Sequence, residues 1–122
     1  MSVHVLAIDD SRVMRSLLTD SLERAGFTVT TAVDGEDGVA KFRDQGADLV
    51  ITDVNMPRKD GFGVIEDIRN GPVNRTVPVL VLSTESGAAM KERARAAGAT
   101  GWIVKPFEET AMVAVIKRLT GG

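Results

Sequence analysis

Five side chains that could carry out chemistry follow four apolar runs of the sequence. They are Asp9, Asp10, Asp53, Ser83 and Lys105. Two carboxylates about 4 Å apart repel each other by about 4 kcal/mol at an effective dielectric constant of about 20, so three that converge require a cation. An all-oxygen ligand set favours a hard ion such as Mg²⁺. A carboxylate beside that ion could attack phosphorus and form an aspartyl phosphate, whose negative charge the lysine and hydroxyl groups would bind.

These residues can act together only if the runs before them are neighbouring strands. Apolar runs at 3–8, 27–31, 48–52, 79–82 and 101–104 alternate with five segments of helical spacing. Several runs are almost continuously apolar, which is typical of a parallel sheet covered by helices on both faces. The pattern predicts an α/β fold, a doubly wound, flavodoxin-like (βα)5 sheet with strand order 2-1-3-4-5. Such folds gather their functional residues at the carboxyl ends of the strands.

Capping residues and glycines predict where the helices begin and end. An apolar stripe marks the first helix: Val13, Met14, Leu17, Leu18, Leu22 and Ala25. Asp34 and Ser86 are the candidate N-caps of the second and fourth helices. Considered without the other acids, Asp10 could be the N-cap of the first helix and have no chemical role. Four glycines follow helical segments and are expected in the left-handed conformation: Gly26, Gly46, Gly71 and Gly98.

Length and composition are those of one globular domain. The 122 residues are 43% hydrophobic and 26% charged, enough for one core, so we expect a single domain over residues 1–122. A net charge of −2 argues against a general nucleic-acid binder. The absence of cysteine excludes a disulfide scaffold, a cysteine zinc site and a thiol nucleophile. The longest near-apolar run, 77–82, is too short for membrane insertion, and no signal peptide is recognisable, so we expect a cytoplasmic protein.

The sequence resembles the receiver domains of two-component response regulators over nearly its whole length. The matching motifs are Asp9-Asp10-Ser11-Arg12, Asp53-Val54-Asn55-Met56-Pro57, Asp60-Gly61, Ser83 and Lys105-Pro106-Phe107. The resemblance implies that Asp53 accepts a phosphoryl group from a phosphohistidine of a sensor histidine kinase. It also implies a cis peptide bond between Lys105 and Pro106.

The same resemblance implies roles for the residues around the acceptor. The implied magnesium ligands are Asp9, Asp10, Asp53 and the backbone carbonyl of Asn55. Ser83 and Lys105 would contact the phosphoryl group. The protein would then be a phosphoacceptor that assists its own phosphorylation and dephosphorylation, and not an enzyme.

A conformational switch is implied as well. Phosphorylation of Asp53 would draw Ser83 toward the phosphoryl group, and an aromatic residue on the fifth strand would turn inward. The surface of the fourth helix, fifth strand and fifth helix would change as a result. Trp102 stands at that aromatic position, where the family usually has Tyr or Phe. Lys91 and Arg95 on the neighbouring helix make this surface a candidate for binding an acidic partner segment.

Three residues are expected to tune the formation or lifetime of the acyl phosphate. Thr84 stands where receivers commonly carry Ala or Gly, and its branched side chain should crowd the approach to phosphorus. Asn55 and Glu85 each lie two places beyond a key site residue and flank the route of the hydrolytic water.

Within the family, the sequence is most similar to stand-alone chemotaxis receivers of the CheY type, notably over residues 101–107 and in Asn55 with Glu85. Because the sequence ends almost where the last helix ends, we expect a monomeric receiver without an output domain. The implied partners are a chemotaxis histidine kinase, the flagellar motor switch or another protein target, and a phosphatase. Other single-domain receivers act in phosphorelays or as phosphate sinks, so that alternative stays open.

Two other functions compete with a receiver. A phosphohydrolase of the haloacid dehalogenase type also uses an Asp nucleophile, Mg²⁺ and a Lys, but it needs a second Asp two residues after the nucleophile. Asn55 occupies that position and cannot take the proton. A nucleotide- or flavin-binding module needs a Gly-rich loop after the first strand, where this sequence has Asp9-Asp10-Ser11.

Overall fold

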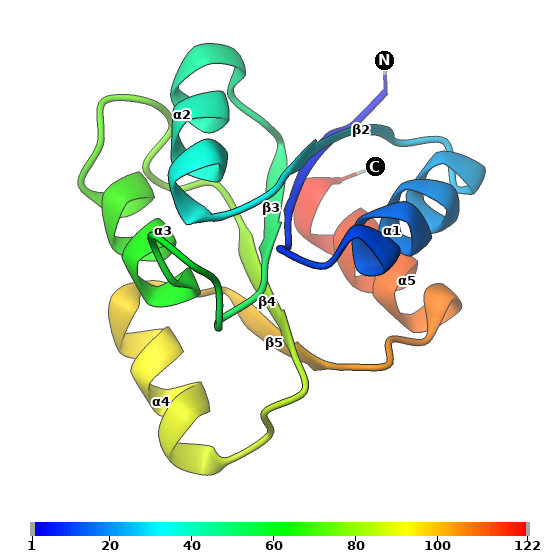
Figure 1. The fold of residues 1–122 in the computed structure, drawn as a ribbon. Coiled ribbons are helices and arrows are strands. Elements are labelled where there is room, and N and C mark those ends of the chain that lie inside the picture. The colour runs from blue at the N-terminus through cyan, green and yellow to red at the C-terminus, as the bar shows by residue number, and fades with distance from the viewer. Residues whose placement is uncertain (1, 122) are drawn as a thin grey trace.

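Five parallel strands form the centre of the molecule. The computed structural model describes residues 2–121, and Figure 1 shows their arrangement. The strands are β1 His4–Ile8, β2 Thr28–Ala32, β3 Leu49–Thr52, β4 Val79–Ser83 and β5 Gly101–Val104. They pair in the order β2-β1-β3-β4-β5, so the predicted α/β doubly wound topology is confirmed. The expected domain range of 1–122 includes Met1 and Gly122, which lie outside the described residues.

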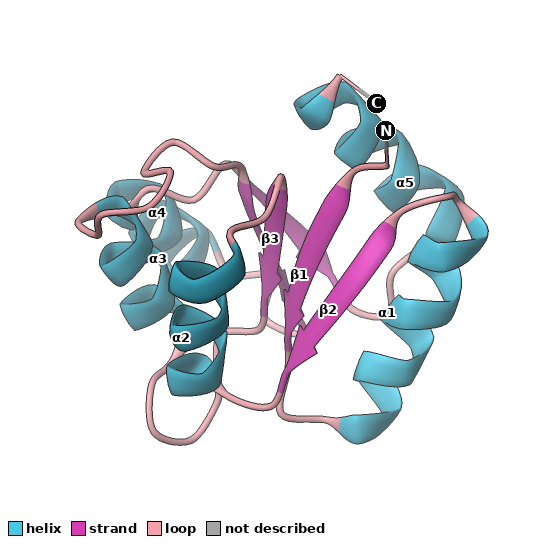
Figure 2. Ribbon diagram, turned by 90° about the horizontal axis from the view of Figure 1, so that it is seen from above, coloured by secondary structure: helices cyan, strands magenta, loops and turns pink. Residues whose placement is uncertain are grey.

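Helices cover both faces of the sheet. They are α1 Arg12–Arg24, α2 Gly35–Gln45, α3 Gly61–Arg69, α4 Ala88–Ala97 and α5 Glu109–Thr120. Figure 2 shows α1 and α5 on one face and α2, α3 and α4 on the other. Among residues 2–121, no helix combines the length and apolar character needed to cross a membrane.

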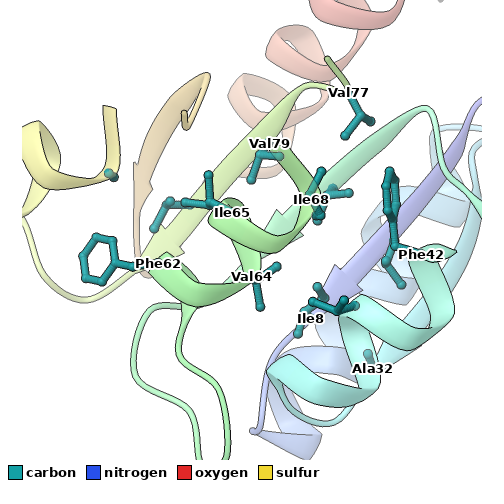
Figure 3. Packing of buried hydrophobic residues seen from close by; sticks show 14 of the residues in the cluster. Ile8, Ala32, Phe42, Phe62, Val64, Ile65, Ile68, Val77 and Val79 are labelled. Carbon is teal, nitrogen blue, oxygen red and sulfur yellow. The ribbon is translucent and has the colours of Figure 1, made fainter. Parts of the chain in front are cut away.

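The alternation of side chains along each strand divides the apolar core in two. Leu6 and Ile8 of β1 pack on the side of α2 and α3, whereas Val5 and Ala7 pack on the side of α1 and α5. The first cluster is seen in Figure 3, where Phe42 of α2 lies among its members. Because both faces are covered, β3 and β4 are buried along their whole length.

Strand register places the predicted site residues at one edge. Ile8 of β1 pairs with Thr52 of β3, so Asp9 and Asp53 emerge side by side at the ends of neighbouring strands. Ser83 at the end of β4 pairs with Val104, the residue that precedes Lys105.

The predicted helix boundaries are partly right. Asp34 caps α2, and a positive φ is confirmed at Gly26, Gly46 and Gly98, with values of 92°, 70° and 113°. Gly98 has the left-handed helical conformation, whereas Gly46 has an extended ψ of −174°. The prediction is wrong for Gly71, which has no positive φ; Asn70, with an ordinary negative φ, is the C-cap of α3.

The alternative in which Asp10 only caps α1 is excluded, and the N-cap predicted for α4 is wrong. Ser11, not Asp10, caps α1, and its hydroxyl accepts a hydrogen bond from the Met14 N–H. Gly87, not Ser86, precedes α4, and it provides no side-chain cap.

The apolar stripe predicted for α1 is too wide. Leu18 and Leu22 are buried, but Val13 is 70% exposed and Leu17 is 48% exposed. Successive helical residues are rotated by about 100°, so Leu17 points away from the core that its neighbour Leu18 enters. The narrower stripe that includes Leu18 and Leu22 holds α1 against the sheet.

Adjacent leucines on α1 provide a matched test of this packing. Leu18→Ala should lower the free energy of unfolding by about 2–5 kcal/mol because it leaves a cavity in the core. Leu17→Ala should change it by about 1 kcal/mol or less, since about half of the residue is exposed and no full cavity is left. Urea denaturation monitored by circular dichroism measures both values. Equal losses in the two variants would contradict the placement of α1.

Candidate functional site

Three carboxylates converge where β1 and β3 end. One oxygen from each of Asp9, Asp10 and Asp53 lies within 4.8 Å of the others. Asp9 is buried, Asp53 is half-buried and Asp10 is exposed, so the cluster opens to solvent on one side. Its donors are all carboxylate oxygens, which fit a hard divalent cation such as Mg²⁺. The predicted acidic cluster is thus brought together by the fold.

Lys105 joins two members of this cluster. Its Nζ donates to Asp9 Oδ2 at 2.9 Å and to Asp53 Oδ2 at 3.2 Å. The side chain is 12% exposed, so this ammonium group is largely withdrawn from water. The peptide bond between Lys105 and Pro106 is cis, as predicted. One ammonium group thus contacts two of the three carboxylates.

Backbone amides hold the remaining oxygens of the two paired carboxylates. Asp9 Oδ1 accepts from the Ser11 N–H at 2.9 Å, and Asp53 Oδ1 accepts from the Val54 N–H at 2.7 Å. Each of these carboxylates is thus held by a backbone amide on one oxygen and by Lys105 on the other. Their orientations are fixed before any ligand binds.

Arg15 is a residue of this region that the sequence did not predict. Its Nη1 donates to the backbone carbonyl of Asp9 at 2.8 Å. This contact fixes the chain directly after β1, where the acidic cluster begins. The signal available in the sequence was its place one turn after the N-cap Ser11, on the helix that follows the two acids.

The protonation of the site reflects burial and its excess of negative charge. Burial raises the pKa of Asp53, and the Asp9 carboxylate acts in the same direction. The Val54 N–H and Lys105 oppose this rise without cancelling it. Burial alone would lower the pKa of Lys105, but its hydrogen bonds and attraction to the two carboxylates outweigh burial and raise it. Lys105 therefore stays charged, while Asp53 ionises less readily than an ordinary aspartate.

A chain of hydrogen bonds runs from Ser83 to Trp102. The Ser83 hydroxyl, which is buried at the end of β4, accepts from the Glu85 N–H at 3.1 Å. The Trp102 indole Nε1 donates to the Glu85 carbonyl at 2.8 Å. The backbone of one residue thus contacts both side chains that were predicted to switch.

The other predicted residues lie around this edge and on the adjoining surface. Asn55, Thr84 and Glu85 are exposed on the loops that follow β3 and β4. Lys91 and Arg95 of α4, together with Trp102, line a hollow of about 350 Å³ between α4 and β5.

Comparison with known proteins decides the family. The profile of the response regulator receiver domain matches residues 5–117. The chain belongs to the response regulator receiver family. A probable chemotaxis protein CheY from Rhizobium etli is 36% identical over 120 residues, which cover 98% of this chain and 93% of that protein. Protein PilG from Pseudomonas aeruginosa is 34% identical over 113 residues, which cover 93% of this chain and 84% of PilG.

A solved structure supports the same assignment. The chemotaxis protein CheY4 of Vibrio cholerae matches with a TM-score of 0.92 at 37% identity, over 98% of this chain and 99% of CheY4. As a receiver, the chain is a phosphoacceptor signalling module and not an enzyme in the usual sense. Its acidic triad is typical of the Mg²⁺-binding site of receivers, and receivers interact with histidine kinases.

The raised pKa of Asp53 predicts that its charge destabilises the metal-free fold. A carboxyl group whose folded-state pKa is raised contributes most to stability below its ordinary value of 3.8, and that contribution is lost as pH rises through the raised pKa. In EDTA at pH 7, Asp53→Asn should therefore raise Tm by a few degrees, since each unit of pKa corresponds to about 1.4 kcal/mol. Thermal denaturation at pH 7 and pH 4 tests this, with a smaller difference expected at pH 4. A lower Tm for the variant at pH 7 would contradict the assignment.

Proposed function

We propose that this receiver takes a phosphoryl group from a chemotaxis histidine kinase onto Asp53, with Mg²⁺ at the acidic cluster, and then binds a target of the motility machinery. The observation that carries the proposal is the contact of one buried ammonium group, Lys105, with both Asp9 and Asp53 at the carboxyl edge of the sheet. No catalytic base is needed, because an ionised carboxylate is already a nucleophile.

The ligands of the ion would be three side chains and one backbone group: Asp9, Asp10, Asp53 and the carbonyl of Asn55. Bound Mg²⁺ supplies positive charge beside the carboxylates and a ligand position for a phosphoryl oxygen. The buried Asp9 keeps its geometry through the Ser11 N–H, whereas the exposed Asp10 leaves the cluster accessible from solvent.

Phosphoryl transfer at this site exchanges one bond to phosphorus for another. A carboxylate oxygen of Asp53 bonds to phosphorus as the phosphorus–nitrogen bond of the phosphohistidine breaks, and the imidazole nitrogen keeps the electron pair. The new phosphoryl group adds negative charge beside Lys105, whose Nζ is already in contact with Asp53. Lys105 and the Ser83 hydroxyl then bind the phosphoryl oxygens. Thr84, exposed beside this route, narrows the approach to phosphorus.

Movement of Ser83 would be transmitted through Glu85 to Trp102. The Ser83 hydroxyl now accepts from the Glu85 N–H, so its turn toward a phosphoryl oxygen breaks or reorients that bond. The carbonyl of the same residue holds the Trp102 indole, and the loop therefore couples the two side chains. Asn55 and Glu85, exposed on opposite loops, would set how long the acyl phosphate lasts by controlling access of water.

The α4–β5–α5 surface would then bind the target. Lys91 and Arg95 give the hollow between α4 and β5 two positive charges beside the apolar ring of Trp102, which suits an acidic segment of a partner protein. The similarity to a probable chemotaxis protein CheY from Rhizobium etli and to the chemotaxis protein CheY4 of Vibrio cholerae supports chemotaxis as the setting. The flagellar motor switch is the target that the family resemblance implies.

Transfer of ³²P from a panel of purified histidine kinases tests the proposed function. We expect rapid Mg²⁺-dependent labelling of the wild-type chain by a chemotaxis-type kinase and no labelling of Asp53→Asn. Loss of labelling in EDTA should be restored by added Mg²⁺. Equal labelling of the Asp53→Asn variant would overturn the assignment of Asp53 as the acceptor. Labelling only by kinases of other pathways would overturn the assignment to chemotaxis.

Trp102 should report activation through its fluorescence. It is the single tryptophan of the chain, so all indole emission comes from the switch position. Beryllofluoride with Mg²⁺ mimics the phosphoryl group and should change the emission, because the Trp102 bond to Glu85 depends on the loop that Ser83 moves. Asp53→Asn is the control and should show no change. An unchanged wild-type spectrum would contradict a switch that works through the indole.

A further inference from the structure

The loop of residues 54–60 carries the Asn55 carbonyl and is open to solvent on its outer side. Asn55 and Arg58 are exposed, and only the Val54 side chain is fully buried among these residues. The Val54 carbonyl accepts from the Gly61 N–H at 2.8 Å, which anchors the end of the loop nearest α3. Met56 packs against the core cluster, and Lys59 Nζ lies 2.6 Å from Asp67 Oδ2 of α3. The contacts of the loop with α2 are the remaining ones that set its position.

The loop touches the first turn of α2 through its backbone. In Figure 1 this green loop lies beside the cyan N-terminal turn of α2. A Cβ atom built on Gly35 would lie 2.1 Å from the Lys59 carbonyl oxygen and 2.7 Å from the Lys59 Cβ. Gly35 does not adopt a positive φ, so the need for glycine comes from space and not from backbone conformation. Neither contacting atom is the end of a flexible side chain, so the loop itself must shift to admit a methyl group.

Asp34 strengthens the same junction. It is buried; its Oδ1 accepts from the Asp37 N–H at 2.8 Å, and its Oδ2 lies 3.6 Å from Arg58 Nε. Arg58 has a φ of 71°, a left-handed conformation that is unfavourable for a residue with a side chain. Its side chain is 69% exposed, so the ion pair contributes little stability. The backbone contact at Gly35 is thus the constraint that ties this part of the loop to α2.

The other side of the loop is equally tight. A Cβ on Gly61 would lie 2.3 Å from the carbonyl oxygen of Asp53, so the start of α3 is pressed against the end of β3. Backbone contacts thus confine the loop both at α2 and at the start of α3. A shift of Lys59 must therefore be taken up by the few residues that lead back to Asn55. We propose that Gly35 is a positioning residue that seats this loop on α2 and thereby sets the Asn55 carbonyl for Mg²⁺. The inference rests on the magnesium site of the proposed function.

Comparison with a second glycine separates this role from ordinary packing. A Cβ on Gly71 would lie 2.7 Å from the Asp67 carbonyl oxygen, again a backbone clash, but at the far end of α3. Gly35→Ala and Gly71→Ala should both lower Tm. Only Gly35→Ala should weaken Mg²⁺ binding, by about tenfold or more, as is usual when the support of a metal ligand is lost. Gly71→Ala should stay within about twofold of the wild type.

Isothermal titration with Mg²⁺ measures these affinities at a temperature where circular dichroism shows each variant folded. Failure of the wild type to bind Mg²⁺ would overturn the proposed function and this inference with it. Binding by the wild type with the same affinity in Gly35→Ala would overturn the inference alone.

Hydrogen exchange in the wild type decides the question even if Gly35→Ala does not fold. Coupling between two sites is reciprocal, so Mg²⁺ must stabilise the turn that seats its loop. The Asp37 and Gly38 amides, both bonded to Asp34, should exchange more slowly with Mg²⁺, although no proposed ligand lies on α2. The Met112 amide, which makes the corresponding first bond of α5, is the control and should not change. Equal exchange of the Asp37 and Gly38 amides with and without Mg²⁺ would overturn the inference.

Discussion

The mutual repulsion of Asp9, Asp10 and Asp53 is the constraint on which the rest of the structure depends. Oxygens of three carboxylates lie within 4.8 Å of one another, and Lys105 donates to two of these carboxylates. Burial, together with the charge of Asp9, raises the pKa of Asp53. Hydrogen bonds and attraction to Asp9 and Asp53 raise the pKa of Lys105 against the effect of burial. A divalent cation would balance the negative charge of the cluster. A phosphoryl group, which adds further negative charge, can be accommodated only when that cation is present.

Strand pairing and core packing hold this repulsive cluster in place. Parallel strands bring Asp9 and Asp53 to one edge through the pairing of Ile8 with Thr52, and apolar layers on both faces keep the strands rigid. The loops that follow β3 and β4 are more exposed than the strands. They carry Asn55, Thr84 and Glu85, the residues proposed to respond to phosphorylation. The strands thus provide the geometry of the site, and the backbone of Glu85 connects the Ser83 hydroxyl with the Trp102 indole.

Features that depend on neighbours in sequence could be predicted, and features that depend on distant contacts could not. The parallel sheet could be predicted from apolar runs that alternate with helical segments. The convergence of Asp9, Asp10 and Asp53 could then be predicted because each follows such a run and the carboxyl ends of parallel strands meet at one edge. The exposure of Leu17 was missed because an apolar residue at helical spacing looks the same whether or not another element covers it. The contact between Gly35 and Lys59 joins residues far apart in the chain, and no local pattern marks it.

The site of the covalent bond to phosphorus tests the central claim most directly. The wild-type chain, phosphorylated by its kinase with Mg²⁺ and without it, can be reduced with borohydride, which converts an aspartyl phosphate to homoserine, and the peptides then mapped by mass spectrometry. Homoserine should appear at position 53 alone, and only in the Mg²⁺ sample. Homoserine at position 9 or 10, or equal modification of position 53 without a divalent cation, would contradict the account.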